Sequence, residues 1–115
     1  MLVYLDPESV RQFTHSLKPS SINRLYYLFG NELTRLKGNI IESLENNRED
    51  QLHAHAHALK GCASNYGAIT LSRFANSLES AKINDVTTEE ILQLLDVYCD
   101  GTQKEALELA EHYRH

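Results

Sequence analysis

Residues 20–47 read SSINRLYYLFGNELTRLKGNIIESLENN, and this stretch decides the fold. Its apolar residues recur at alternating steps of four and three over about three heptads, which is typical of a helix with one face in a core. These residues are Ile22, Tyr26, Phe29, Leu33, Leu36, Ile40 and Leu44. Ser20 or Ser21 is the expected N-cap, and Asn46 with Asn47 is expected to end the helix. A face this long needs partner helices of similar length.

The helical period continues on both sides of this stretch, and strand-like alternation is missing. Helices are predicted at residues 7–17, 51–66 and 68–82, and from residue 87 or 88 to about 113. Asp6 is the expected N-cap of the first helix, Pro19 is expected to stop its continuation, and Gly67 is expected to cap the third in the left-handed conformation. The sequence therefore predicts an all-α fold. We expect an antiparallel four-helix bundle (core about 20–114) with a short extra N-terminal helix, in a single domain over residues 1–115.

The last helix offers two interpretations. Thr87 and Glu90 form a capping box, and a stripe follows at Ile91, Leu95, Tyr98, Thr102, Ala106 and Tyr113. Asp100-Gly101 could break the helix, since Thr102 and Glu105 resemble a second capping box. We favour one long, possibly bent helix, because the stripe stays in phase across the glycine.

Composition limits the class of protein. With 115 residues, 42% hydrophobic and 23% charged, the chain is suited to one small core. The net charge of −5 argues against nucleic-acid binding, which needs clustered Lys and Arg. No apolar run is long enough to span a membrane and no export signal is evident, so we expect a cytoplasmic protein. We expect a monomer, since a four-helix bundle can bury its stripes internally. Cys62 and Cys99 are expected to be reduced core thiols.

The segment from His57 to Gly61 reads HALKG. The predicted core stripe of this helix is Leu52, Ala56, Leu59, Ala63 and Tyr66. His57 lies off that stripe, and Lys60 and Gly61 lie one turn further along its outer face. A glycine inside a helix costs about 1 kcal/mol relative to alanine, so it is either tolerated at the surface or needed for close approach by another molecule.

His57-Ala-Leu-Lys60-Gly61, followed by Gly67-Ala68, resembles the signature of histidine-containing phosphotransfer (HPt) domains. The resemblance extends through Leu71 and Leu78 and covers nearly the whole chain. The small size of the chain and its HALK…GA core are also similar to those of a small quorum-sensing phosphorelay protein. The resemblance implies a helical bundle whose histidine, here His57, is phosphorylated.

Four further residues are candidates for the same site. Glu79 lies just outside the Leu78 core position and 22 residues after His57, where the family commonly has Gln or Glu, and we expect it to orient the imidazole. Lys60 is expected to offset the charge of the phosphoryl oxygens. Gly61 and Ser64 are expected to line the surface that a partner approaches. The plainer alternatives are a surface carboxylate for Glu79 and a solvated lysine for Lys60.

His53, His55 and His57 alternate in a way that could suggest a metal site. Helical geometry places only His53 and His57 on one face, and two imidazoles make a weak site. We therefore expect no metal, assign His53 to the partner-binding surface and expect His55 to be a semi-buried packing residue.

The chain has no phosphate-binding loop and no acidic cluster for magnesium, so its phosphoryl donor must be another protein. The resemblance implies receiver domains that carry an aspartyl phosphate and supply Mg²⁺, so the chain needs no cofactor of its own. We expect a stand-alone phosphocarrier without kinase activity, which accepts a phosphoryl group from the receiver domain of a hybrid sensor kinase and passes it to a response regulator. The alternative is a helical docking module that binds receivers or a kinase without transferring phosphate.

Overall fold

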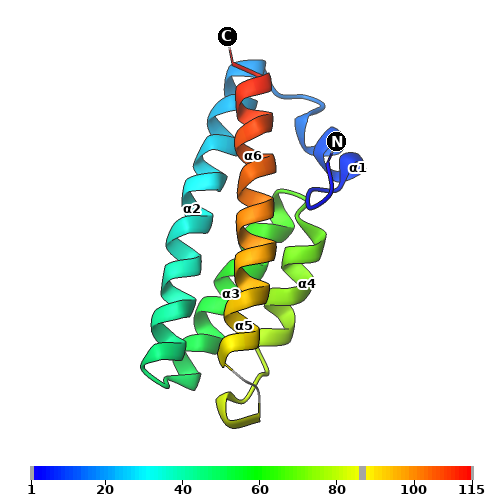
Figure 1. Ribbon diagram of the computed structural model, residues 1–115. Coiled ribbons are helices and arrows are strands. Elements are labelled where there is room, and N and C mark those ends of the chain that lie inside the picture. Colours follow the sequence, from blue (N-terminus) through cyan, green and yellow to red (C-terminus); the bar gives the residue numbers. More distant parts are fainter. Residues whose placement is uncertain (1, 86–87, 115) are drawn as a thin grey trace.

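The structure is a computed structural model that describes residues 2–85 and 88–114. These residues form helices and turns without a strand among them, which confirms the all-α prediction. The helices are α1 (Pro7–Thr14), α2 (Pro19–Glu45), α3 (Glu49–Asn65), α4 (Ile69–Leu78), α5 (Thr88–Leu95) and α6 (Gly101–His112). The molecule measures 47 × 21 × 21 Å. Figure 1 shows α2 and α6 side by side along its length, α3 and α4 forming the rest of the bundle, and α1 beside one end.

α2 is the long helix around which the bundle packs. All seven predicted stripe residues are buried. The predicted N-cap at Ser20 or Ser21 is wrong, because the helix already begins at Pro19, after Lys18, which makes no side-chain cap. Proline suits a first helical position, since the N–H that it lacks would have no helical partner there. Pro19 thus opens α2, and α1 ends at Thr14, three residues before its predicted end.

α3 and α4 form an antiparallel hairpin joined at Gly67. The core side of α3 is completely buried at Leu52, Ala56, Leu59 and Ala63. Gly67 has a φ of +78°, and the N–H of Ala68 donates to the carbonyl of Ala63 at 2.9 Å, the Schellman arrangement for a helix end. α4 ends at Leu78 instead of residue 82, because the N–H of Ala81 bonds back to Leu78 in a tight turn. Glu79 is therefore the C-cap of α4.

α5 and α6 make one continuous helix. A π-helical turn at Asp96–Asp100 joins them, and Gly101 has right-handed helical backbone angles. This confirms one long helix over a break at Asp100-Gly101. The second capping box is wrong: the Thr102 hydroxyl donates to the Tyr98 carbonyl at 2.6 Å, and Glu105 is buried. The predicted capping box at Thr87 lies outside the described residues.

The buried carboxylate of Glu105 holds the N-terminal strap, which we define as residues 2–6. It accepts hydrogen bonds from the backbone N–H groups of Val3, Tyr4 and Leu5 at 2.9 to 3.0 Å. The N–H of Asp6 donates to the carbonyl of Gly67 at 2.9 Å, and the Asp6 side chain caps α1 as predicted. The strap therefore ties the C-terminal helix to the α3–α4 turn.

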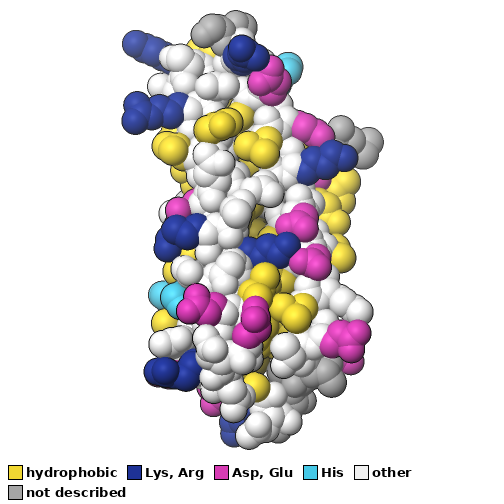
Figure 2. Space-filling model, turned by 60° about the vertical axis from the view of Figure 1, so that its left-hand side comes forward, with side chains coloured by type: hydrophobic (Ala, Val, Ile, Leu, Met, Phe, Trp, Pro, Cys, Tyr) yellow, Lys and Arg dark blue, Asp and Glu magenta, His cyan; other side chains and the backbone are white. Residues whose placement is uncertain are grey.

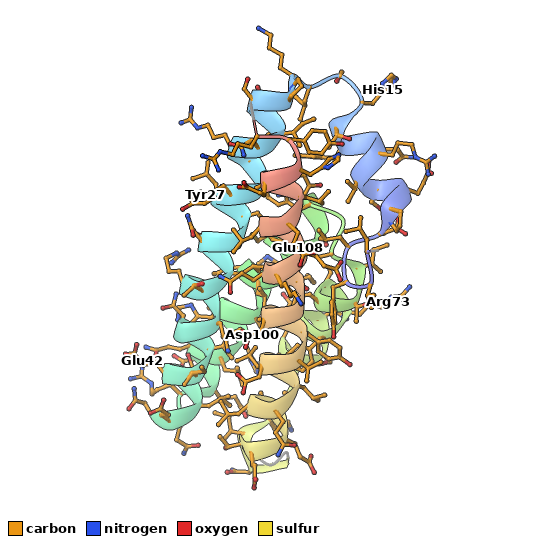
Figure 3. The ribbon with its side chains drawn as sticks, turned by 45° about the horizontal axis from the view of Figure 1, so that its top comes forward. His15, Tyr27, Glu42, Arg73, Asp100 and Glu108 are labelled. Atoms are coloured by element: carbon orange, nitrogen blue, oxygen red, sulfur yellow. The ribbon has the colours of Figure 1, made fainter. Side chains whose placement is uncertain are left out.

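A second polar contact joins α2 to the C-terminal helix. The ammonium of Lys37 on α2 pairs with Asp96 at 2.7 Å and with Asp100 at 2.9 Å. Asp100 is labelled in Figure 3, where it lies on the C-terminal helix near α2, while Tyr27 and Glu42 project outward from α2. This contact joins α2 to the π turn.

Both cysteines are free, Cys99 buried and Cys62 half-buried. Burial raises the pKa of the Cys99 thiol to about 12 and that of Cys62 to about 11, so both are protonated at neutral pH. On the face drawn in Figure 2, acidic and basic side chains occur together, with hydrophobic groups between them. Within the described residues, no helix is both long and apolar enough to cross a membrane.

Candidate functional site

The outer face of α3 carries the candidate nucleophile beside α4. Because Leu59 and the other apolar residues of α3 point into the core, His57 points outward, and its side chain is 73% exposed. Lys60, one turn further along, is 32% exposed at its side chain. Both side chains reach α4, so the site lies along the line where α3 meets α4, which we call the α3–α4 seam.

The carboxylate of Glu79 lies between His57 and Lys60. One of its oxygens, Oε1, is hydrogen-bonded to Nδ1 of His57, and the other, Oε2, accepts from the ammonium of Lys60 at 2.5 Å. An ionised carboxylate can only accept, so the neutral imidazole carries its hydrogen on Nδ1 and its lone pair on Nε2. The three residues that the sequence indicated are therefore in direct contact.

The surroundings of Glu79 favour its ionised form. The hydrogen bond from Lys60 has the largest effect and lowers the pKa of the carboxyl group, partial burial opposes this, and the hydrogen bond from His57 lowers the pKa further. Its side chain is only 20% exposed. The site consequently holds a fixed negative charge against the inner nitrogen of His57.

Sequence reasoning missed two polar residues on α4. The side-chain oxygen of Asn76 lies 3.4 Å from the ammonium of Lys60, and the Ser72 hydroxyl lies 2.7 Å from that of Ser64 on α3. Ser72, Asn76 and Glu79 follow one another at steps of four and three, so they share one face of α4. This spacing was the available signal, and it continues the polar seam for two turns beyond His57.

Gly61 leaves the surface next to His57 bare. It is exposed, and a Cβ atom added there would meet nothing within 4 Å. Ser64 is also exposed, although its hydroxyl is engaged by Ser72. The open turn agrees with the sequence, and contact of Gly61 and Ser64 with a partner stays a prediction.

The other two histidines of α3 differ in their surroundings. His53 is half-buried, and its Nε2–H donates to the backbone carbonyl of Ala81 at 2.6 Å, so part of its side chain faces the protein rather than a partner. His55 is half-buried, as the sequence predicted. Over the described part of the chain, no group of three or more His, Cys, Asp or Glu residues is arranged to hold a metal ion.

Comparison with known families gives one match. The family model described as Hpt domain matches residues 24–112, a span that starts within α2, ends with α6 and includes the α3–α4 seam. Searches of curated proteins and of solved structures gave no significant match.

Proposed function

The chain belongs to the Hpt domain family, whose domains transfer phosphoryl groups in two-component systems, and we propose that it is the histidine phosphotransfer protein of a multistep phosphorelay. In this role His57 accepts a phosphoryl group from the aspartyl phosphate of a hybrid sensor kinase's receiver domain and passes it to a response regulator. Hpt domains act as phosphocarriers without kinase activity of their own. The contact of Glu79 with both His57 and Lys60 carries this proposal.

The Nε2 atom of His57 is the proposed nucleophile. Nδ1 is engaged by Glu79, whereas the exposed ring leaves the Nε2 lone pair for a partner. Attack forms a bond between Nε2 and phosphorus while the bond from phosphorus to the aspartate oxygen breaks, and the aspartate leaves as a carboxylate. Because Nδ1 keeps its hydrogen, the phosphorylated ring carries a positive charge.

Glu79 has two proposed effects on this step. It holds the imidazole in the tautomer that leaves Nε2 free, and its negative charge stabilises the cationic ring that forms, as the aspartate of a catalytic triad does. The lowered pKa of Glu79 keeps the carboxylate ionised for both.

Lys60 is the proposed cation for the phosphoryl oxygens. Its ammonium is held one helical turn from His57 by Glu79 and Asn76. A cation placed in advance stabilises negative charge without reorganising at the moment of transfer. Removing Lys60 should therefore slow transfer without abolishing it.

The rest of the machinery is assigned to the partner. The carboxylate of Glu79 is already shared by His57 and Lys60, which leaves the seam poorly suited to hold Mg²⁺. We propose that a receiver domain supplies both the aspartyl phosphate and Mg²⁺, and that it approaches over Gly61 and Ser64. A cytoplasmic location and the narrower likeness to quorum-sensing relay proteins belong to the same proposal.

Phosphorus NMR tests the proposal. The wild type, His57→Gln and a control, His15→Gln, are incubated with phosphoramidate and then with a phosphorylated receiver domain. His15 is also an exposed histidine and lies beyond α1, as labelled in Figure 3. A phosphohistidine signal is expected in the wild type and in His15→Gln, and its loss is expected in His57→Gln. No signal from either donor would contradict the proposal and favour a docking module that binds receivers without transferring phosphate.

A further inference from the structure

His53 makes a contact that the proposed mechanism does not use. Its Nε2–H donates to the carbonyl of Ala81 at 2.6 Å, across a sequence separation of 28 residues. His53 lies one helical turn before His57 on α3, and Ala81 lies two residues after Glu79. The contact therefore joins the helix of the nucleophile to the backbone just beyond its orienting carboxylate.

The backbone around Glu79 lies where α4 ends: the N–H of Glu79 still bonds back to the carbonyls of Ala75 and Asn76 at 3.2 Å. Glu79 is the C-cap of α4, where carbonyl groups no longer find partners within the helix. The N–H of Ala81 bonds to the carbonyl of Leu78 at a long 3.3 Å, which closes the tight turn that contains Glu79. The imidazole of His53 holds the far side of this turn.

A second contact holds the same segment further along. The carboxylate of Glu49, in the first turn of α3, accepts the N–H of Ile83 at 2.8 Å. Two side chains from the N-terminal half of α3 thus bind the chain that leaves α4. His53 acts two residues from Glu79, whereas Glu49 acts four residues away.

We propose that His53 is a positioning residue for His57: by holding Ala81 it fixes the turn that carries Glu79 and so sets the carboxylate against the inner nitrogen of His57. This proposal rests on the proposed function of His57. One turn of α3 separates the two histidines, so one imidazole places the group that orients the other. His53 then has a role inside the seam, in addition to any contact with a partner.

The size of the effect follows from the contact. Loss of one hydrogen bond between neutral groups corresponds to about a fivefold change in an equilibrium or a rate. Transfer also depends steeply on the orientation of the imidazole. We therefore expect His53→Leu to slow phosphorylation of His57 about fivefold.

The experiment uses three variants of the full chain. His53→Leu removes the N–H donor, and His53→Gln supplies an amide donor in its place. His55→Leu is the matched control, because His55 is a half-buried histidine on the same helix for which the described residues provide no hydrogen-bond partner. Two quantities are measured: the tautomer of the His57 imidazole by ¹⁵N NMR, which needs no phosphoryl donor, and the rate of labelling by phosphoramidate.

The expected result is a lower population of the Nδ1–H tautomer of His57 and about fivefold slower labelling in His53→Leu, with recovery of both in His53→Gln. His55→Leu should change neither quantity. Wild-type tautomer and rate in His53→Leu, or equal changes in His55→Leu, would overturn the positioning role. If the wild type is labelled neither by phosphoramidate nor by a phosphorylated receiver domain, the proposed function fails, while the tautomer measurement still decides the role of His53.

Discussion

Two glutamates of this protein each bind several donors, but they do so in different settings. Glu105 is 7% exposed and, among the described residues, accepts from backbone N–H groups alone, in a strap about one hundred residues away in sequence. Glu79 accepts from the side chains of His57 and Lys60, at the edge of a seam open to solvent. Donors fixed in the backbone make Glu105 a structural tie, whereas donors that can move or change charge make Glu79 suited to chemistry.

The surroundings of a carboxylate decide whether it contributes mainly to stability or mainly to function. Removing a buried acceptor leaves its donors without partners, which costs free energy of folding. Removing a carboxylate at the edge of an open seam costs less stability, because water can reach the side-chain donors that it leaves. The two glutamates should therefore respond in opposite ways to the same substitution.

The largest effect is expected for Glu105→Ala. Three N–H groups of the strap lose a charged acceptor, so the free energy of unfolding should fall by about 3 kcal/mol. Urea unfolding followed by circular dichroism measures this. Glu105→Gln keeps an acceptor oxygen and should lose clearly less. Phosphorylation of His57 should persist in the folded fraction, and its loss at unchanged stability would show that the strap takes part in transfer.

Glu79→Ala should have the opposite profile. The rate of phosphoryl transfer to His57 is expected to fall about 30-fold, because the imidazole loses both its fixed tautomer and its counter-charge. Urea unfolding should be close to wild type. Glu79→Gln retains an acceptor for the Nδ1–H and should recover part of the rate. A Glu79→Ala protein that transfers at the wild-type rate would contradict the assigned role.

The sequence indicated the position of Glu79 and missed the contacts of Glu105, and the reason is physical. Glu79 binds side chains, and its place just outside the Leu78 core position, together with the family spacing of 22 residues after His57, indicated it. Glu105 binds backbone N–H groups, which every residue except proline possesses and which therefore leave no sequence signal. Its spacing from Thr102 suggested a capping box instead.

The same distinction applies to the helices themselves. The four-three rhythm of α2 specified its buried face from Ile22 to Leu44, because core packing depends on side-chain type. The start of α2 at Pro19 and the π turn at Asp96–Asp100 were not predicted. These features depend on the backbone and on tertiary contacts that the period of apolar residues does not encode.

Two helical glycines allow a finer test of the same contrast between stability and function, with smaller expected effects. The backbone of Gly101 is ordinary helix, but an added Cβ would overlap the ring of Tyr4 in the strap. Gly101→Ala should therefore lower the free energy of unfolding by about 1 to 2 kcal/mol. A Cβ atom added at Gly61 would point into open space, so Gly61→Ala should raise the free energy of unfolding by up to about 1 kcal/mol.

Gly61→Ala should nevertheless slow transfer from a receiver domain, because the added methyl group stands where the partner approaches. Labelling by phosphoramidate is the control, since this small donor needs less room than a protein. Equal rates from the receiver in Gly61→Ala and wild type would remove Gly61 from the docking surface.

The smallest effect concerns the charge of Glu79. The hydrogen bond from Lys60 is the main cause of its lowered pKa, so Lys60→Met should move that pKa back up toward the ordinary glutamate value of 4.5. A carboxyl group with a lowered pKa in the folded state contributes stability that is present above its unfolded pKa and is lost as the pH falls through the folded pKa. In Lys60→Met this contribution should be smaller, and its loss should be complete at a higher pH than in the wild type.

Carbon NMR of the Glu79 carboxyl group against pH measures the shift directly, with Lys104→Met as a control on an exposed lysine of α6. An upward shift in Lys60→Met alone would establish that the ammonium of Lys60 is paired with Glu79 in solution before any phosphoryl group arrives. An unchanged titration would mean that Lys60 is not paired with Glu79 in solution. The ammonium of Lys60 would then have to move to the phosphoryl oxygens during transfer. The contrast with Glu105 would still hold, but Glu79 would then orient His57 without also holding Lys60.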